Sequence, residues 1–198
     1  MTPPGVPPRV SATLLRHLAP LVVTAGLGAI ATGLLPPAPL RALELRGATH
    51  FTRPPWKVTL RSYNSTVSQP SAEYYFTVVL AEDAGAALGE LQFRQTRGVD
   101  TQFQFSPGRT RAFLGQPRRE GPAVPVEAAF DQEERLVTVR FPEPVPPGST
   151  LTVMLKPWAN PSMSDTYLFQ VMALPAGPNP SAVSLGFATL RIYDPDWR

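Results

Sequence analysis

Proline is the residue that most constrains how this chain can fold. The chain has 25 prolines, and 17 of them follow residue 42, where they are spread out rather than clustered. An interior proline costs an α-helix about 3 kcal/mol, because it lacks an N–H and clashes with the preceding turn. Short strands joined by proline-containing loops tolerate this spacing. The apolar and aromatic residues between the prolines argue against disorder. The pattern therefore predicts a folded, all-β protein.

Eight segments between the prolines show the alternation and β-branched content of strands. They are residues 56–63, 74–80, 91–95, 101–105, 136–141, 151–155, 165–174 and 183–193. Their number and spacing predict an all-β, immunoglobulin-like β-sandwich of about seven to nine strands. Segment 74–80 is apolar on both faces and is expected in the interior of a sheet. The expected core residues are Val58, Leu60, Tyr75, Val79, Phe93, Val137, Val139, Val153, Leu155, Leu168 and Val171.

Two short segments predict local structure between the strands. Glu82–Leu88 has an acidic start and three alanines, which favours a short helix that caps one end of the sandwich. Pro147-Gly148 fits the central pair of a type II turn, in which glycine takes the position with positive φ.

An uncharged apolar stretch of 18 residues, Leu18–Leu35, lies between basic residues and the breaker Pro36–Pro39. This order is typical of an export signal. It predicts a signal peptide over residues 1–42, cleaved near Ala42, and one β-sandwich domain over 43–198. A retained N-terminal membrane anchor is the alternative, because 18 residues at about 1.5 Å each just span a bilayer. A buried helix of a globular fold is the third reading.

Charge and cysteine content exclude several functions. Residues 43–198 hold 15 basic and 15 acidic side chains, because three of the 18 bases and none of the acids precede them. A domain with no net charge lacks the basic footprint of nucleic-acid binding. The absence of cysteine excludes lipid-modified lipoproteins, disulfides, thiol catalysis and cysteine-bound metals.

The residues that could bind a metal have simpler interpretations. His50 is the only histidine after the leader, so two imidazoles from one chain cannot share a metal. Met154, Met163 and Met172 suggest cuprous copper, but strand-like surroundings favour core packing for Met154 and Met172. The acidic groups lack the spacing of a calcium loop and are expected to be solvated turns. These groups are Glu82 with Asp83, and Asp131 with Glu133 and Glu134.

No reaction is indicated by the nucleophiles and bases. The sequence has no G-x-S-x-G elbow, and Lys57 and Lys156 lack an S-x-x-K neighbour. A carboxylate pair for glycoside hydrolysis depends on a separation in space and stays open. Asn64-Ser65-Thr66 matches a glycosylation acceptor and is interpreted as a turn. We therefore expect no catalytic residues, no cofactor and no metal.

Aromatic and arginine residues leave a binding surface open. One set could form a sugar-stacking platform or a protein hot spot, although packing in the core and under loops is favoured. This set is Trp56, Trp158, Trp197, Tyr74, Tyr75 and Tyr167. A second set, Arg109, Arg111, Arg118 and Arg119, could be an anionic-partner patch, although a solvated loop is favoured.

Several motifs in order resemble one protein family. They include YYFTV at 74–78, LAEDAGAAL at 80–88, FPEPVPPGST at 141–150, LKPWANP at 155–161 and TYLFQV at 166–171. Together they resemble the domain of unknown function 2808 family over Phe51–Tyr193. The resemblance implies an exported protein of the kind found chiefly in cyanobacteria, and it implies no activity. A weaker likeness to periplasmic copper-resistance sandwiches supports only the immunoglobulin-like architecture, because their histidine ligands are missing here.

These inferences predict a non-catalytic, exported structural or protein-interaction module of the cell envelope. The expected partner is another envelope or membrane protein, with no nucleic acid, and Leu18–Leu35 would contact the membrane if it is not cleaved. The alternatives are an accessory subunit docked on a membrane complex through a retained anchor, and a glycan-binding or glycan-acting protein. The periplasm, the thylakoid lumen and the cell envelope are all compatible locations.

Overall fold

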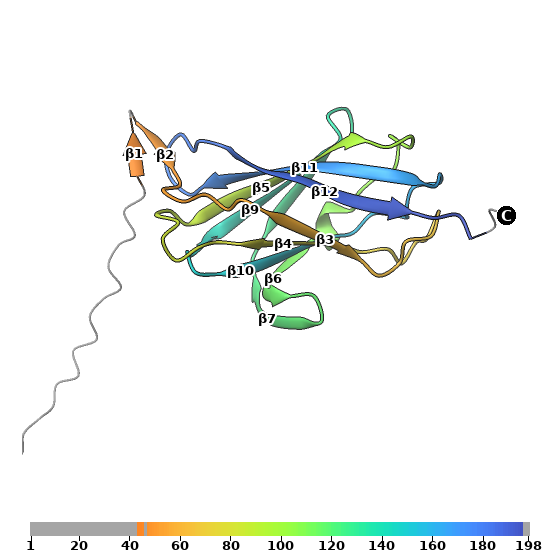
Figure 1. The fold of residues 1–198 in the computed structure, drawn as a ribbon, viewed down its shortest axis with the longest axis horizontal. Helices are drawn as coiled ribbons and strands as arrows, with labels where there is room; N and C mark the ends of the chain where they lie inside the picture. Colours follow the sequence, from red (N-terminus) through yellow and green to blue (C-terminus); the bar gives the residue numbers. More distant parts are fainter. Residues whose placement is uncertain (1–42, 46, 196–198) are drawn as a thin grey trace, which may run out of the picture. The chain divides into compact units, whose positions relative to one another are not determined.

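The structure is a computed structural model that describes residues 43–45 and 47–195, all within one compact unit, Pro39–Arg198. Its main element is a pair of antiparallel five-stranded sheets packed face to face (Figure 1). The first sheet has the order β3 (Val58–Ser62), β4 (Tyr74–Val79), β10 (Thr150–Leu155), β6 (Arg111–Gln116) and β7 (Arg119–Val124). The second has the order β12 (Val183–Ile192), β11 (Asp165–Pro175), β5 (Leu88–Arg97), β9 (Leu136–Val145) and β8 (Glu127–Asp131).

Two smaller elements complete the described part of the chain. A hairpin of β1 (Leu43–Leu45) and β2 (Ala48–His50) precedes the sandwich, and a single 3₁₀ turn, η1, covers Pro107–Arg109. Within the described ranges, no helix combines the length and the apolar character that crossing a bilayer requires. The predicted signal or anchor helix at Leu18–Leu35 lies outside the described residues.

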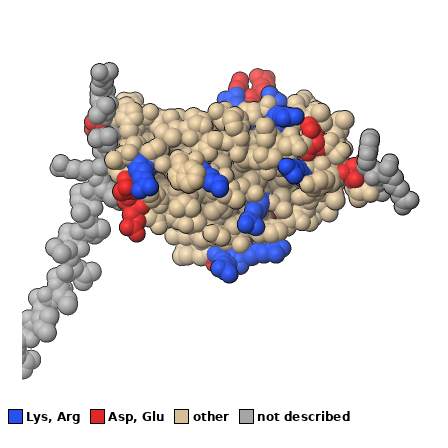
Figure 2. Space-filling view, viewed as in Figure 1, with Lys and Arg blue, Asp and Glu red and all other residues tan. Residues whose placement is uncertain are grey.

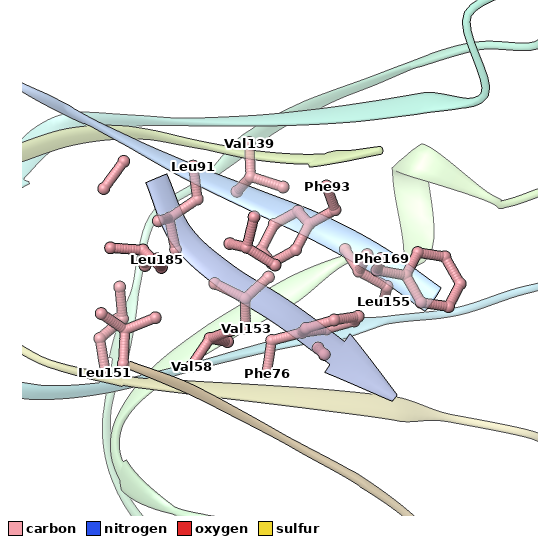
Figure 3. Packing of buried hydrophobic residues seen from close by; sticks show 14 of the residues in the cluster. Val58, Phe76, Leu91, Phe93, Val139, Leu151, Val153, Leu155, Phe169 and Leu185 are labelled. Carbon is pink, nitrogen blue, oxygen red and sulfur yellow. The ribbon is translucent and has the colours of Figure 1, made fainter. Parts of the chain in front are cut away.

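The core forms because alternate residues of each strand point between the sheets. Tyr74, Phe76 and Val78 of β4 are fully buried, and β5 and β11 face them with side chains such as Phe93 and Phe169. Figure 3 shows side chains from both sheets meeting in this layer. The ring centroid of Phe76 lies 4.6 Å from that of Phe93 and 5.8 Å from that of Phe169. Tilted and edge-on aromatic pairs of this kind add to the stabilisation from burial alone.

The predicted fold class, an all-β immunoglobulin-like sandwich, is confirmed. Seven of the predicted core residues are buried in it: Val58, Phe93, Val137, Val139, Val153, Leu155 and Val171. Leu60 is partly buried against the same core. Segment 74–80 is an interior strand, as expected, with β3 and β10 on its two sides.

Two core predictions were wrong, because Val79, 58% exposed, and Leu168, half-buried, lie on the outer faces of β4 and β11. Tyr75 is buried as predicted, but in a separate cluster on the outer face of the first sheet. In β4 and β11 both faces carry apolar residues, so alternation does not identify the inner one. A shift of one residue moves the whole set to the other face.

Two local predictions were also wrong. Residues 101–105 form no strand, since Phe105 makes only an isolated bridge to Pro157. Residues 82–88 form no helix, but a turn that leads into β5. Gly85 has φ of +73°, and a Cβ there would lie 2.2 Å from Thr52 Oγ1. This close approach holds the segment against residues 52 and 53, whose N–H groups donate to the Ala84 carbonyl.

The segment from Arg111 to Asp131 supplies three strands that sequence reasoning missed. With them, the described sandwich has two sheets of five strands rather than the seven to nine strands expected in all. The proline–glycine turn before β10 is as predicted, because Gly148 has φ of +79°.

Candidate functional site

The outer face of the first sheet carries the most distinctive surface among the described residues. On β3, Val58 and Leu60 point inward, so Thr59 and Arg61 point outward, and both are exposed. On β4 the same alternation directs Thr77 and Val79 outward. The register pairs Thr59 with Thr77, so side chains from the two strands meet on one surface.

A small apolar cluster forms one end of this face. Tyr75, Phe113 and Met154, here called the outer cluster, are each at least 93% buried although they lie outside the sandwich. Tyr63 packs edge-on against one of them, with its ring centroid 5.7 Å from that of Tyr75. The Arg118 guanidinium lies 4.0 Å from the centroid of the Tyr63 ring, as in a cation–π contact. The turn of the β6–β7 hairpin is thereby fixed against the end of β3.

The hairpin turn and the two strands enclose a groove of about 390 Å³, within the range of small-molecule sites. We call it the Trp56 groove, and its lining residues are Trp56, Lys57, Thr59, Arg61, Thr77, Val79, Gln116 and Pro117. Trp56 is 80% exposed and Val79 58% exposed. Exposed large apolar side chains beside polar groups are typical of binding surfaces.

The groove is positively charged. Lys57 and Arg61 line it, and none of the lining residues is acidic. The Lys57 Nζ lies 6.0 Å from the centroid of the Trp56 ring. Among the described residues, neither cation forms an ion pair, whereas Arg111 on the same face pairs with Glu120 at 3.7 Å. In Figure 2, basic side chains follow one another from the region of β3 down to the β6–β7 hairpin.

The floor of the groove offers a hydrogen-bond acceptor. Thr152, fully buried, places its Oγ1 2.7 Å from the Gly115 carbonyl oxygen and 2.9 Å from the Thr77 Oγ1. A hydroxyl has a single hydrogen, and the carbonyl can only accept. Thr152 therefore donates to Gly115 and accepts from Thr77. The lone pairs of the Thr77 oxygen are left for a ligand.

The described members of the aromatic set do not form one platform, which was the alternative to packing in the core and under loops. Tyr74 and Tyr167 are fully buried in the core, Tyr75 belongs to the outer cluster, and Trp197 lies outside the described residues. Packing in the core was therefore the correct interpretation for Tyr74 and Tyr167. It was wrong for Trp56 and Trp158, which are 80% and 67% exposed.

The arginine set is divided between two elements. Arg109 ends η1, while Arg111, Arg118 and Arg119 belong to the β6–β7 hairpin. All four side chains are exposed to solvent as expected, but Arg111 and Arg119 lie on strands rather than in a loop. Arg118 takes a positive φ of 66° at the turn between them. Arg111 pairs with Glu120 and Arg118 contacts Tyr63, so the four do not act as one patch.

The metal candidates do not converge. Met154 lies on the outer face of the first sheet and Met172 on that of the second, so the sandwich separates them. Asp83 pairs with Arg53 at 3.1 Å, and Glu134 pairs with Arg94. In the described part of the chain, no three histidine or acidic side chains gather as a metal site would require.

Sequence reasoning missed most of the groove and one buried cation. Thr59, Arg61, Thr77 and Gln116 carry no signal of their own, because strand pairing alone brings them to one surface. Lys156 is 5% exposed, and its Nζ donates to the Pro70 and Ala72 carbonyls at 3.1 and 2.8 Å. It holds the loop before β4 against the end of β10.

This chain is similar to a described protein family and to several solved structures. A family model described as "Protein of unknown function (DUF2808)" matches residues 48–192. No curated protein matches.

Solved structures with a similar arrangement of strands include bacterial surface proteins. The collagen adhesin CNA from S. aureus shows 6% identity over 71% of this chain and 50% of its own, with a TM-score of 0.41. The major pilin BcpA of Bacillus cereus shows 12% identity over 70% and 40%, with a TM-score of 0.43. ACE19, the collagen-binding subdomain of the Enterococcus faecalis surface protein ACE, shows 6% identity over 70% and 97%, with a TM-score of 0.41. This chain spans half or less of the first two, and what these proteins bind is not assigned to it.

Proposed function

The chain belongs to the DUF2808 family, whose description names no activity, and we propose that it is a non-catalytic, exported interaction module that binds through the Trp56 groove. The observation that carries this proposal is the tryptophan itself. Trp56 is 80% exposed beside Val79, Lys57 and Arg61. Tryptophan and arginine are the residues most enriched among the energetic centres of protein interfaces.

The chemistry of the groove supports binding rather than catalysis. Its only hydroxyls belong to Thr59 and Thr77, and the hydrogen of the Thr77 hydroxyl is donated to Thr152. A threonine nucleophile needs a neighbouring base, and the lining residues include no carboxylate or imidazole.

Export is supported by the order of basic residues, apolar stretch and prolines within residues 1–42. The family model begins after this segment, at residue 48. We infer that residues 1–42 direct export and that 43–198 is the functional domain. Fractionation of the native host, followed by N-terminal sequencing, tests this. A start near Leu43 outside the cytoplasm is expected, a full-length start in the membrane fraction supports the retained anchor, and a cytosolic product contradicts export.

Binding is tested with the full chain, tagged and purified from its native host. We expect it to sediment with envelope material from that host, and Trp56→Ala to lose most of this binding. Trp158→Ala is the matched control, because Trp158 is also exposed but lies outside the groove. Equal loss in both variants, or in neither, would contradict the groove as the binding site.

A further inference from the structure

The charge of the Trp56 groove selects the sign of its ligand. Lys57 and Arg61 are its only ionisable lining residues, so the groove attracts anions and repels cations. The planar guanidinium of Arg61 presents paired donors that match the two oxygens of a carboxylate. The ligand therefore carries negative groups, and a carboxylate fits this donor set.

The groove lies on the outer face of the first sheet, over the edge strand β3 and the interior strand β4, and this position argues against an extended peptide. β4 lies between β3 and β10, so its backbone N–H and C=O groups are engaged on both sides. Strand addition would take place at the free edge of β3, in the plane of the sheet and beside the groove. A peptide laid across the face itself would leave its own backbone groups without backbone partners. Side chains must provide the recognition here.

The side chains that face the groove match a sugar. Thr59 and Gln116 can both donate and accept, and the Thr77 oxygen accepts, so they suit hydroxyls that do both. The exposed Trp56 ring provides a flat apolar surface on which the apolar face of a sugar ring can stack. Trp56 precedes β3 and Arg61 lies near its end, so a ligand that touches both runs along the strand.

We propose that the Trp56 groove binds an anionic polysaccharide rich in uronic acids. Trp56 stacks on one sugar ring, Arg61 and Lys57 pair with carboxylates, and Thr77 and Gln116 bond to ring hydroxyls. This inference rests on the proposed function, since it names the class of partner for the same groove.

The test measures binding of the full chain, purified from its native host, to polygalacturonate. Neutral dextran, poly-L-glutamate and dextran sulfate are compared with it. We expect binding to polygalacturonate, none to dextran, and affinity at least tenfold weaker for poly-L-glutamate and dextran sulfate. A tenfold change corresponds to about 1.4 kcal/mol.

Groove variants identify the site. Trp56→Ala and the double variant Lys57→Gln/Arg61→Gln should each weaken binding at least tenfold, by the loss of stacking and of the carboxylate partners respectively. Trp158→Ala and Arg109→Gln/Arg191→Gln are the matched controls, because they remove an exposed tryptophan and two exposed charges outside the groove. They should stay within about twofold of the wild-type affinity. All the substituted side chains are exposed, so each variant is expected to keep the unfolding temperature of the wild type. Measurement of that temperature for every variant verifies that the fold is unchanged.

Three outcomes would overturn the inference. Equal or tighter binding of poly-L-glutamate would indicate an acidic protein partner. Dextran sulfate binding that equals or exceeds polygalacturonate binding, with no effect of Trp56→Ala, would indicate nonspecific attraction of polyanions. A lack of binding to all four polymers would exclude an anionic glycan. In that case the proposed function would still stand if Trp56→Ala, but not Trp158→Ala, loses binding to native envelope material.

Discussion

Neighbouring residues of one strand can have opposite roles in this sandwich. Val78 is fully buried between the sheets, while Val79, the next residue of β4, is 58% exposed in the Trp56 groove. Their side chains are identical, and only the face of the strand differs. The pair therefore separates the contribution of a side chain to stability from its contribution to binding.

Val78→Ala should lower the free energy of unfolding by about 2–3 kcal/mol, because it removes buried methyl groups and leaves a cavity. Val79→Ala should change it by no more than about 0.5 kcal/mol, as surface substitutions usually do. Urea unfolding of both variants measures the difference. Similar losses in the two variants would show that both faces of β4 are buried in solution.

The ionisation of individual tyrosines predicts how the stability of the fold depends on pH. Burial, the hydrogen bond to Glu73 and the charge of Glu73 raise the pKa of Tyr75 from 10.0 to about 12. Burial also raises the pKa of Tyr167 to about 12, and it raises the pKa of Tyr74 further. Below pH 10 the folded and unfolded chains both keep these protons. Above it, the unfolded chain loses them first, so stability falls as the pH rises.

Tyr75→Phe should make that fall shallower than in the wild type, because one of the groups that cause it is gone. The free energy of unfolding, measured by urea at several values between about pH 8 and about pH 11, gives both slopes. Identical slopes above pH 10 would mean that the Tyr75 hydroxyl is as accessible to solvent in the folded chain as in the unfolded one.

At the scale of elements, the alternation of apolar residues locates strands better than it assigns their faces. β5, β9, β10 and β12 were found because apolar and polar residues alternate or because a short apolar run is bounded by proline or glycine. β7 was missed because every residue in it except Val124 is exposed, so no apolar face marks it. Pairing with β6 across a tight turn holds this strand in place instead.

The candidate site was only partly predictable for a related reason. Trp56 and Lys57 are adjacent in the sequence, and Trp56 was singled out as an aromatic of interest. Thr77 and Gln116 come from β4 and β6, and they meet β3 only through the order and register of the first sheet. Neither order nor register can be read from one sequence in which several registers bury similar side chains.

The turn at Gly85 gives a prediction about an element that was expected to be a helix. Gly85→Ala should destabilise the fold more than Gly186→Ala, although both glycines have positive φ, +73° and +85°. A left-handed conformation costs a side-chain-bearing residue about 1–2 kcal/mol. Gly186 has open space around it, so Gly186→Ala is destabilised only by the left-handed backbone conformation. Gly85→Ala has the same backbone cost and in addition a collision of its Cβ with Thr52.

Chemical denaturation of the two glycine variants measures the difference directly. Equal losses would mean that residue 52 moves aside freely, and that the turn does not depend on the close approach of these two segments.

For the molecule as a whole, net charge conceals how charge is distributed. Residues 43–198 contain equal numbers of acidic and basic side chains. The Trp56 groove nevertheless has two cations and no acid, while an acidic turn, with Asp131 and Glu134, lies on the second sheet between β8 and β9. Exclusion of nucleic acid from the net charge stays a prediction, and a local anionic ligand is compatible with it.

Truncation tests which part of the chain the sandwich needs. Removal of residues 1–42 should leave the free energy of unfolding within about 0.5 kcal/mol of the full chain, because the proposed leader is cleaved from the exported protein. Removal of residues 1–50 should cost about 2 kcal/mol or more, because it deletes the buried Thr49 and leaves its partners without hydrogen bonds.

The hydrogen bonds of Thr49 explain why the longer truncation should lower the free energy of unfolding more than the shorter one. It is fully buried, its Oγ1 donates to the Pro178 carbonyl at 2.7 Å, and its carbonyl accepts from the Ser181 N–H at 2.9 Å. It thus ties β2 to the loop between β11 and β12. Urea unfolding of both truncated chains and of the full chain in one buffer measures the two costs. Loss of stability on removing 1–42 alone would mean that the leader packs on the sandwich, which is incompatible with its cleavage during export.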